Sequence, residues 1–292
     1  MNQAISAPAR LGLGCATFGR EIDAAAAFVI MDHARAHGID HFDTAPAYGD
    51  GSSERIVGEW LASRSPGQGF VVATKVKPPY TAARIRESVD ASRRRLGRDR
   101  IDRLYLHEWD ATAASDEAIL ALGSLVKTGT VGTIGASNVD LPRLGELHRR
   151  QAELGQARVG AIQNNHNLAV RNVDEPLTLY CRSNDIEVVT YSPLGAGFLT
   201  GKHRHQVQPG SRFALVPAHQ DIYFQPEAQR RLEQLQVAAS RTGLPSALLA
   251  LAWALHQPAT TMVLIGARTT DHLTQAFAAR SLMIASVLPD LS

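Results

Sequence analysis

Short apolar runs recur along the chain at intervals of about thirty residues for most of its length, and each is bounded by polar or turn-forming positions. Runs of this kind, rich in Val, Ile and Leu, are typical of strands that are buried on both faces of a parallel sheet. The predicted strands are Leu11–Gly14, His41–Asp43, Phe70–Ala73, Ile101–Leu106, Thr133–Ala136, Val159–Ile162, Glu187–Tyr191 and Met262–Ile265.

The stretches between these runs have the apolar spacing of amphipathic helices. Gly38 and Gly97 follow two of them, at the position where a helix commonly ends in a left-handed residue. The predicted helices are Ala24–His37, Ser53–Ser63, Thr81–Leu96, Asp116–Val126, Leu141–Gln151, Pro226–Thr242 and Pro245–Leu255.

Alternating strands and helices predict an α/β fold with a parallel sheet. Eight such units in 292 residues favour a single (β/α)₈ TIM barrel that spans residues 1–292 as one domain. The alternative is an open, doubly wound sheet. In a barrel, the chemistry is expected at the carboxyl ends of the strands.

Composition excludes several classes of protein. A hydrophobic content of 45% supports a full core, and a net charge of +2 is too weak to indicate nucleic acid or a membrane surface as a partner. Cys15 and Cys181 offer neither a metal spacing nor a disulfide framework, and no signal-peptide pattern precedes Arg10. We therefore expect a cytoplasmic protein without a metal site, and its oligomeric state stays open.

One lysine stands out, because the chain has four lysines among its 30 basic residues and one of them lies in an apolar strand. Lys75 occupies the run Val71-Val72-Ala73-Thr74-Lys75-Val76. A buried ammonium is costly unless a carboxylate pairs with it. Asp43, at the end of the preceding strand, is the expected partner.

Four polar side chains follow three successive predicted strands. Asp43 ends the second strand, Tyr48 lies in the loop after it, Lys75 ends the third and His107 ends the fourth. Neighbouring strands of a barrel bring such residues together. Each residue alone could be structural, as part of a satisfied ion pair or of the core, but all four at successive strand ends indicate a catalytic site.

Around these four residues the chain resembles the aldo-keto reductases, whose fold is the (β/α)₈ barrel. The order and spacing of several short stretches carry the resemblance over nearly the whole chain. These stretches are Asp43-Thr44-Ala45-Pro46-Ala47-Tyr48-Gly49, Ser53-Glu54, Gly58, Ala73-Thr74-Lys75-Val76, Leu96-Gly97 to Asp102, Leu106-His107, Gly135-Ala136-Ser137-Asn138, Tyr191-Ser192-Pro193-Leu194-Gly195 and Gly266-Ala267-Arg268.

The resemblance implies a catalytic tetrad of Asp43, Tyr48, Lys75 and His107 that reduces an aldehyde or ketone. Tyr48 would donate a proton to the carbonyl oxygen, and Lys75, compensated by Asp43, would lower the tyrosine pKa from about 10 by roughly 1–3 units. His107 would orient and polarise the carbonyl group.

The resemblance also implies a nicotinamide dinucleotide. Tyr191 would stack on the nicotinamide ring, and Arg268 would meet a 2′-phosphate or the adenine, which favours NADP(H) over NAD(H). The implied residues are Ser137, Asn138 and Gln163 at the nicotinamide amide; Ser192, Pro193, Leu194, Gly195, Gly197 and Leu199 at the pyrophosphate; and Gly266, Ala267, Arg268, Thr269 and His272 at the adenosine phosphate.

Other features leave the substrate open. Gln275 and Ala276 stand where the family usually has a Glu-Asn-like pair for adenine. Phe18 and Trp109 are the expected walls of a substrate pocket, and the loop from 201 to 224 either covers the site or is a surface excursion. Two other functions remain: an NAD-dependent aldose dehydrogenase that takes a sugar substrate, and a cofactor-sensing regulatory subunit with little turnover.

Overall fold

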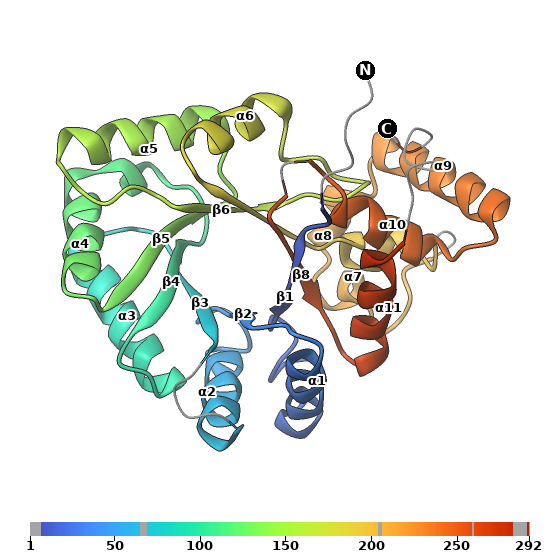
Figure 1. The fold of residues 1–292 in the computed structure, drawn as a ribbon, viewed down its shortest axis with the longest axis horizontal. Coiled ribbons are helices and arrows are strands. Elements are labelled where there is room, and N and C mark those ends of the chain that lie inside the picture. Colours follow the sequence, from blue (N-terminus) through green and yellow to red (C-terminus); the bar gives the residue numbers. More distant parts are fainter. Residues whose placement is uncertain (1–6, 65–68, 204–205, 259, 283–290, 292) are drawn as a thin grey trace.

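Eight parallel strands close into a barrel in the order in which they occur along the chain, with helices around the outside (Figure 1). This computed structural model describes residues 7–64, 69–203, 206–258, 260–282 and 291. The closed sheet confirms the predicted TIM barrel and rules out the open, doubly wound alternative. The strands are β1 (Arg10–Gly14), β2 (His41–Asp43), β3 (Val71–Val76), β4 (Ile101–Leu106), β5 (Val131–Ser137), β6 (Ala161–Asn165), β7 (Glu187–Tyr191) and β8 (Met262–Gly266).

The predicted helices all occur, with ends that differ by a few residues at most. The apolar pattern did not single out α6, although Asp174 caps its start by accepting a hydrogen bond from the Leu177 backbone at 2.9 Å. The α-helices are α1 (Ala24–Ala36), α2 (Ser52–Arg64), α3 (Ala82–Leu96), α4 (Asp116–Lys127), α5 (Leu141–Glu153), α6 (Glu175–Ser183), α7 (Arg212–Leu215), α8 (His219–Tyr223), α9 (Pro226–Thr242), α10 (Ser246–Leu255) and α11 (Thr270–Arg280), and the 3₁₀ helices are η1 (Ala111–Ala114) and η2 (Gly195–Thr200).

The interior of the barrel is filled by side chains from alternate positions of the strands. Ala73, Tyr105 and Ala161 form a small buried cluster there. Gly135 leaves room for the tyrosine, because a Cβ atom at this glycine would lie 2.3 Å from the Tyr105 ring. Lys75 Nζ lies 6.0 Å from the centre of the same ring. Tyr105 therefore supports the lysine from within the barrel.

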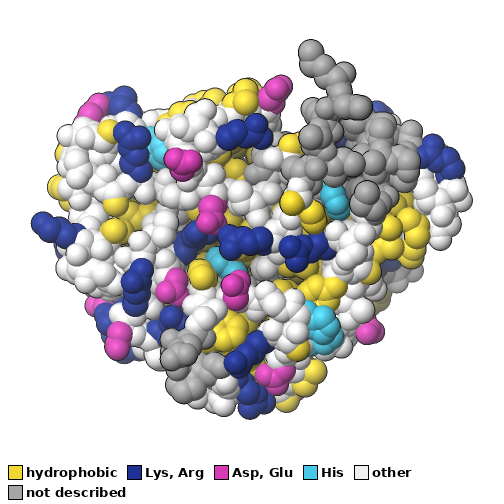
Figure 2. Space-filling model, viewed as in Figure 1, with side chains coloured by type: hydrophobic (Ala, Val, Ile, Leu, Met, Phe, Trp, Pro, Cys, Tyr) yellow, Lys and Arg dark blue, Asp and Glu magenta, His cyan; other side chains and the backbone are white. Residues whose placement is uncertain are grey.

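The outer layer buries the apolar faces of the helices against the strands. Two large clusters of buried apolar side chains make up this layer, one around β1, β2, α10 and α11 and the other around β4, β5 and β6. In the described part of the chain, no helix combines the length and the apolar character needed to cross a membrane. On the face drawn in Figure 2, basic and acidic side chains are interspersed, in keeping with the low net charge.

Candidate active site

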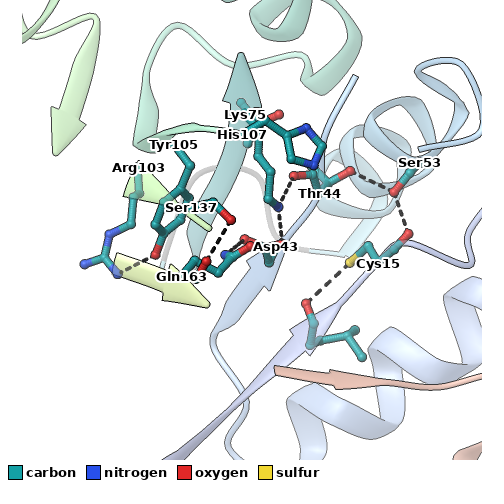
Figure 3. A network of polar contacts seen from close by, with 12 residues as sticks. Cys15, Asp43, Thr44, Ser53, Lys75, Arg103, Tyr105, His107, Ser137 and Gln163 are labelled. Carbon is teal, nitrogen blue, oxygen red and sulfur yellow. Dashed lines mark hydrogen bonds and ion pairs between the residues drawn. The ribbon is translucent and has the colours of Figure 1, made fainter. Parts of the chain in front are cut away.

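A buried ion pair links the ends of β2 and β3. Lys75 and Asp43 have side chains that are 1% and 3% exposed, and the ammonium donates hydrogen bonds to Asp43 Oδ1 and, at 3.0 Å, to the carbonyl oxygen of Thr44. Figure 3 shows the lysine reaching down to these two acceptors. The partner expected from the sequence is thus the partner in the structure.

The second oxygen of the Asp43 carboxylate is also occupied. Gln163 on β6 donates a side-chain N–H to Asp43 Oδ2 at 2.7 Å. Ser137 on β5 donates its hydroxyl to the backbone carbonyl oxygen of Gln163, also at 2.7 Å (Figure 3). A carboxylate can only accept, so the amide nitrogen of Gln163 faces Asp43. Its amide oxygen and its second N–H are then left for the nicotinamide amide that the resemblance implies.

Tyr48 and His107 lie next to the ion pair. Lys75 Nζ is 5.0 Å from the centre of the Tyr48 ring, and the Tyr48 and His107 rings stand perpendicular with their centres 5.9 Å apart. All four side chains of the predicted tetrad line one cavity. The structure thus brings together the residues that the strand ends indicated.

The charges in this cluster follow from burial and from the ion pair. Burial alone would lower the pKa of Lys75, but Asp43 and Tyr48 outweigh it and raise the pKa above its ordinary value. Lys75 is therefore a full positive charge at neutral pH. Because the Asp43 carboxylate pairs with the ammonium, Lys75 does not carry the full free-energy cost of an isolated buried cation.

Tyr48 departs from the prediction. Burial raises the pKa of its hydroxyl above the ordinary value; the Lys75 ammonium opposes this shift, and the Asp43 carboxylate adds to it. The prediction of a lowered pKa is wrong because it considered the neighbouring charge and not the removal of the phenolate from water. The lysine limits the rise, and the tyrosine keeps its proton at neutral pH.

His107 is held neutral. Burial, followed by the positive charges of Lys75 and Lys77, lowers its pKa to about 3. Its Nδ1 atom is buried and has no hydrogen-bond partner among the described residues. A neutral imidazole is both a donor and an acceptor, so one ring nitrogen can donate to a carbonyl oxygen.

The cavity has a volume of about 420 Å³ and extends from the tetrad past the ends of β5, β7 and β8. Besides the tetrad, the predicted residues that line the cavity fall into two groups. Those near the ends of β5, β6 and β7 are Ser137, Asn138, Gln163, Tyr191, Ser192, Pro193, Leu194 and Gly197, and those after β8 are Gly266, Arg268 and His272.

Three lining residues other than glycine hold left-handed backbone conformations, Ala196 with a φ of +56° and two that follow strands. Asn138 follows β5 and Ser192 follows β7, and each has a φ of +56°. Left-handed backbone at a residue other than glycine costs of order 1–3 kcal/mol and is concentrated at functional sites. Asn138 also accepts a hydrogen bond at 2.6 Å from the hydroxyl of Tyr191, which ties the two strand ends together across the cavity.

Several predicted residues lie outside the cavity. Phe18 and Leu199 are fully buried in the apolar core. Trp109 is half-buried and packs near Arg143, whose guanidinium carbon is 6.0 Å from its ring centre. Six of the predicted residues are not among those that line the cavity, and their roles toward cofactor or substrate stay predictions: Phe18, Trp109, Gly195, Leu199, Ala267 and Thr269.

Other lining residues were not predicted. The loop after β1 contributes Thr17 and Glu21, and the segment after β7 contributes Lys202, Arg212 and His219. The described part of the loop from 201 to 224 therefore borders the cavity rather than forming a separate surface excursion. No sequence motif marked Lys202 as a site residue, and nothing local marked Glu21, which forms an ion pair with Arg212 at 3.0 Å.

One end of the cavity is cationic. Lys202, Arg268 and His272 line it, and the His272 ring accepts a hydrogen bond from the Arg268 backbone at 3.2 Å. Burial, with Arg268 as a further cause, lowers the pKa of Lys202. Neither Lys202 nor Arg268 has an ion-pair partner among the described residues. Such a cluster suits an anionic ligand.

Comparison with known proteins agrees with the fold. The model of the aldo/keto reductase family matches residues 10–286. The uncharacterized oxidoreductase YrpG of Bacillus subtilis is 32% identical over 90% of this chain and 85% of its own length. The NADH-specific methylglyoxal reductase of Escherichia coli is 30% identical over 92% of this chain and 89% of its own.

A third relative has a different kind of name. The probable voltage-gated potassium channel subunit beta of Arabidopsis thaliana is 30% identical over 86% of this chain and 80% of its own length. Family membership is thus compatible with more than one role. The match over nearly all of the barrel nevertheless shows that this chain belongs to the aldo/keto reductase family.

Proposed function

We propose that the protein reduces an aldehyde or ketone to the alcohol with NADP(H), and that Tyr48 donates the proton. The observation that carries the proposal is that a protonated tyrosine, a charged lysine and a neutral histidine face one cavity, with the lysine fixed by a buried carboxylate. Reduction of a carbonyl group places negative charge on its oxygen, and a proton donor beside that oxygen lowers the barrier.

Each residue of the tetrad has a separate task in this proposal. Tyr48 gives its proton to the carbonyl oxygen, and Lys75 stabilises the phenolate that results. Asp43, held by Gln163 at 2.7 Å, keeps the lysine in place and charged. His107 donates a hydrogen bond from its neutral ring and orients the carbonyl group toward Tyr48.

The cavity fits a nicotinamide dinucleotide, which supplies a hydride to the carbonyl carbon when it is bound. Tyr191 presents an aromatic ring near the tetrad, where it can stack on the nicotinamide, and the amide groups of Asn138 and Gln163 can bond the carboxamide. Arg268 and Lys202 would hold phosphate at the far end.

The cationic end supports NADP(H) over NAD(H), because a 2′-phosphate adds negative charge where Lys202, Arg268 and His272 gather. One relative, from Escherichia coli and 30% identical, is named an NADH-specific methylglyoxal reductase, so family membership alone does not decide this preference. Fluorescence titration with NADPH and with NADH measures the two affinities. Tighter binding of NADH would contradict the preference proposed here.

The central test is Tyr48→Phe. We expect kcat for aldehydes, diketones or aldoses to fall by about 10²–10⁴-fold, because the general acid is lost. The NADPH dissociation constant should change little, since the phenol oxygen is the only atom removed. Turnover by the variant that is comparable with the wild type would refute the role of Tyr48.

Two other functions would show themselves in the same assays. An aldose dehydrogenase would oxidise sugars with NAD⁺ faster than it reduces aldehydes with NADPH. A regulatory subunit, the role suggested by the name of the Arabidopsis relative, would bind NADPH tightly and turn over none of these compounds. The presence of all four tetrad residues favours an enzyme.

A further inference from the structure

Lys77 continues the row of side chains that leads to the tetrad. It lies two positions after Lys75, just beyond the last residue of β3. Because side chains alternate along a strand, Lys77 lies on the same side as Lys75, one step nearer the mouth of the barrel. Its neighbour across the sheet is His107, whose backbone N–H bonds the Val76 carbonyl at 2.9 Å.

The two lysines differ in their charge partners. The ammonium of Lys75 is buried against Asp43, whereas the exposed Lys77 has neither an ion pair nor a hydrogen bond within the described ranges. Lys77 thus adds an uncompensated positive charge beside His107, just outside the residues that line the cavity.

This charge acts on the group that would hold the substrate carbonyl. Lys75 and Lys77 both act electrostatically on His107, and no carboxylate offsets them at the ring. An aldehyde without charge gains little from a second cation here. An ammonium on a flexible side chain is, however, a suitable point charge for an anionic group.

We propose that Lys77 selects carbonyl substrates that carry a carboxylate a few bonds from the carbonyl group. The inference rests on the proposed function, since it assumes that the carbonyl oxygen lies between Tyr48 and His107. Two residues of strand advance the chain by about 6–7 Å, so the carboxylate would sit one short spacer from the reacting carbon. An aromatic ring or a short carbon chain is such a spacer.

The test compares two aldehydes that differ in charge: 4-carboxybenzaldehyde and its methyl ester. In Lys77→Met we expect KM for the carboxylate to rise about tenfold, as for loss of a charged hydrogen bond, and KM for the ester to stay within about twofold. Lys77→Arg, which keeps the charge, should restore most of the preference. Lys127→Met, an exposed lysine at the end of α4, is the matched control.

A rise in KM that is equal for both aldehydes, or absent for both, would overturn the inference. If the wild type reduces neither compound, the reductase activity is not supported for these aldehydes. The role of Lys77 is then tested by the binding of the corresponding alcohols. Calorimetry on the NADPH-loaded protein would compare 4-(hydroxymethyl)benzoate with its methyl ester. A preference for the anion that disappears in Lys77→Met supports the inference, and no preference in the wild type overturns it.

Discussion

The two ends of the barrel each hold an ion pair between strands, with lysine as the cation at one end and arginine at the other. At the carboxyl end, Lys75 and Asp43 are almost completely buried. At the amino end, Arg103 on β4 bonds Glu187 on β7 at 3.0 Å, and these side chains are 11% and 36% exposed. Arg10 approaches the same glutamate at 3.6 Å.

This difference separates a functional pair from a structural one. Arginine keeps its charge in every protein environment and bonds in a planar fork, which suits a fixed crosslink such as Arg103–Glu187. Lysine is a compact charge that can change the acidity of a neighbouring group. The lysine pair lines the cavity beside Tyr48, whereas the arginine pair lies outside it and Arg103 contacts the buried Tyr105 instead, so the chemistry is expected at the lysine end.

A histidine accompanies each pair. His41, on β2, is 2% exposed and its Nε2 atom has no partner within the described part of the chain. Burial, followed by Arg103 and Arg10, lowers its pKa to about 3, just as burial and two lysines lower that of His107 to about 3. Both ends therefore keep a neutral imidazole among positive charges.

Lys75→Met should have the largest effect. It leaves the Asp43 carboxylate buried without its cation, so we expect the free energy of unfolding to fall by about 3–5 kcal/mol. We also expect kcat to fall by about 10²–10⁴-fold, because Tyr48 loses the charge that stabilises its phenolate. Urea denaturation and initial-rate kinetics measure the two effects.

The double variant Asp43→Asn, Lys75→Met separates stability from catalysis. Removing both charges should recover much of the lost stability while kcat stays low. If the single variant were as active as the wild type, the functional interpretation of the lysine end would be wrong.

A buried histidine predicts that pH affects the free energy of unfolding, with a size between the effects of Lys75→Met and Arg103→Met. The pKa of His41 is about 3 in the folded protein and about 6.5 when unfolded, so the unfolded chain gains a proton first as pH falls. Stability is therefore lost between about pH 6.5 and pH 3, and His41 alone should cost about 2 kcal/mol by pH 5.

His41→Gln isolates this contribution. We expect the free energy of unfolding of the variant to decline less than that of the wild type between pH 7 and pH 5, by about 2 kcal/mol. Because each protein is compared with itself at the two pH values, any change in packing caused by the substitution cancels. Parallel declines in the two proteins would show that His41 is not neutral in the fold.

Arg103→Met should have the smallest effect. Glu187 is partly exposed and keeps Arg10 as a partner, so we expect a loss of stability of about 1 kcal/mol. The kcat should stay within about twofold of the wild type, since the contacts that the substitution removes, to Glu187 and to the Tyr105 hydroxyl, involve no residue that lines the cavity. A decrease in kcat like that of Lys75→Met would remove the distinction between the two ends.

The sequence contained most of the information on the fold. The repeated alternation of short apolar runs and helical stretches is local, so eight units could be counted before any contact was known. The tetrad could also be found, because a barrel places strand ends together whatever fills the loops. The position of α6 was missed, although Asp174 and Pro176 offered start signals for a helix.

The differences between the predicted residues and those that line the cavity concern orientation. Phe18 and Trp109 lie close in sequence to lining positions, but their side chains face the core or an outer helix. Glu21 and Arg212 were missed for the opposite reason, since neither belongs to a motif and they meet across 191 positions of sequence. Loop conformation decides such contacts, and local pattern does not encode it.

By itself the sequence determined the repeat, the order of the strands and the identity of the residues at their ends, because these depend on local periodicity and spacing. Only the tertiary structure decided how those residues act. It placed Gln163 on Asp43 across 120 positions of sequence and removed Tyr48 from water, so that its pKa rises although a lysine stands beside it. Desolvation depends on everything that surrounds a group, and the chain assembles those surroundings only when the barrel closes.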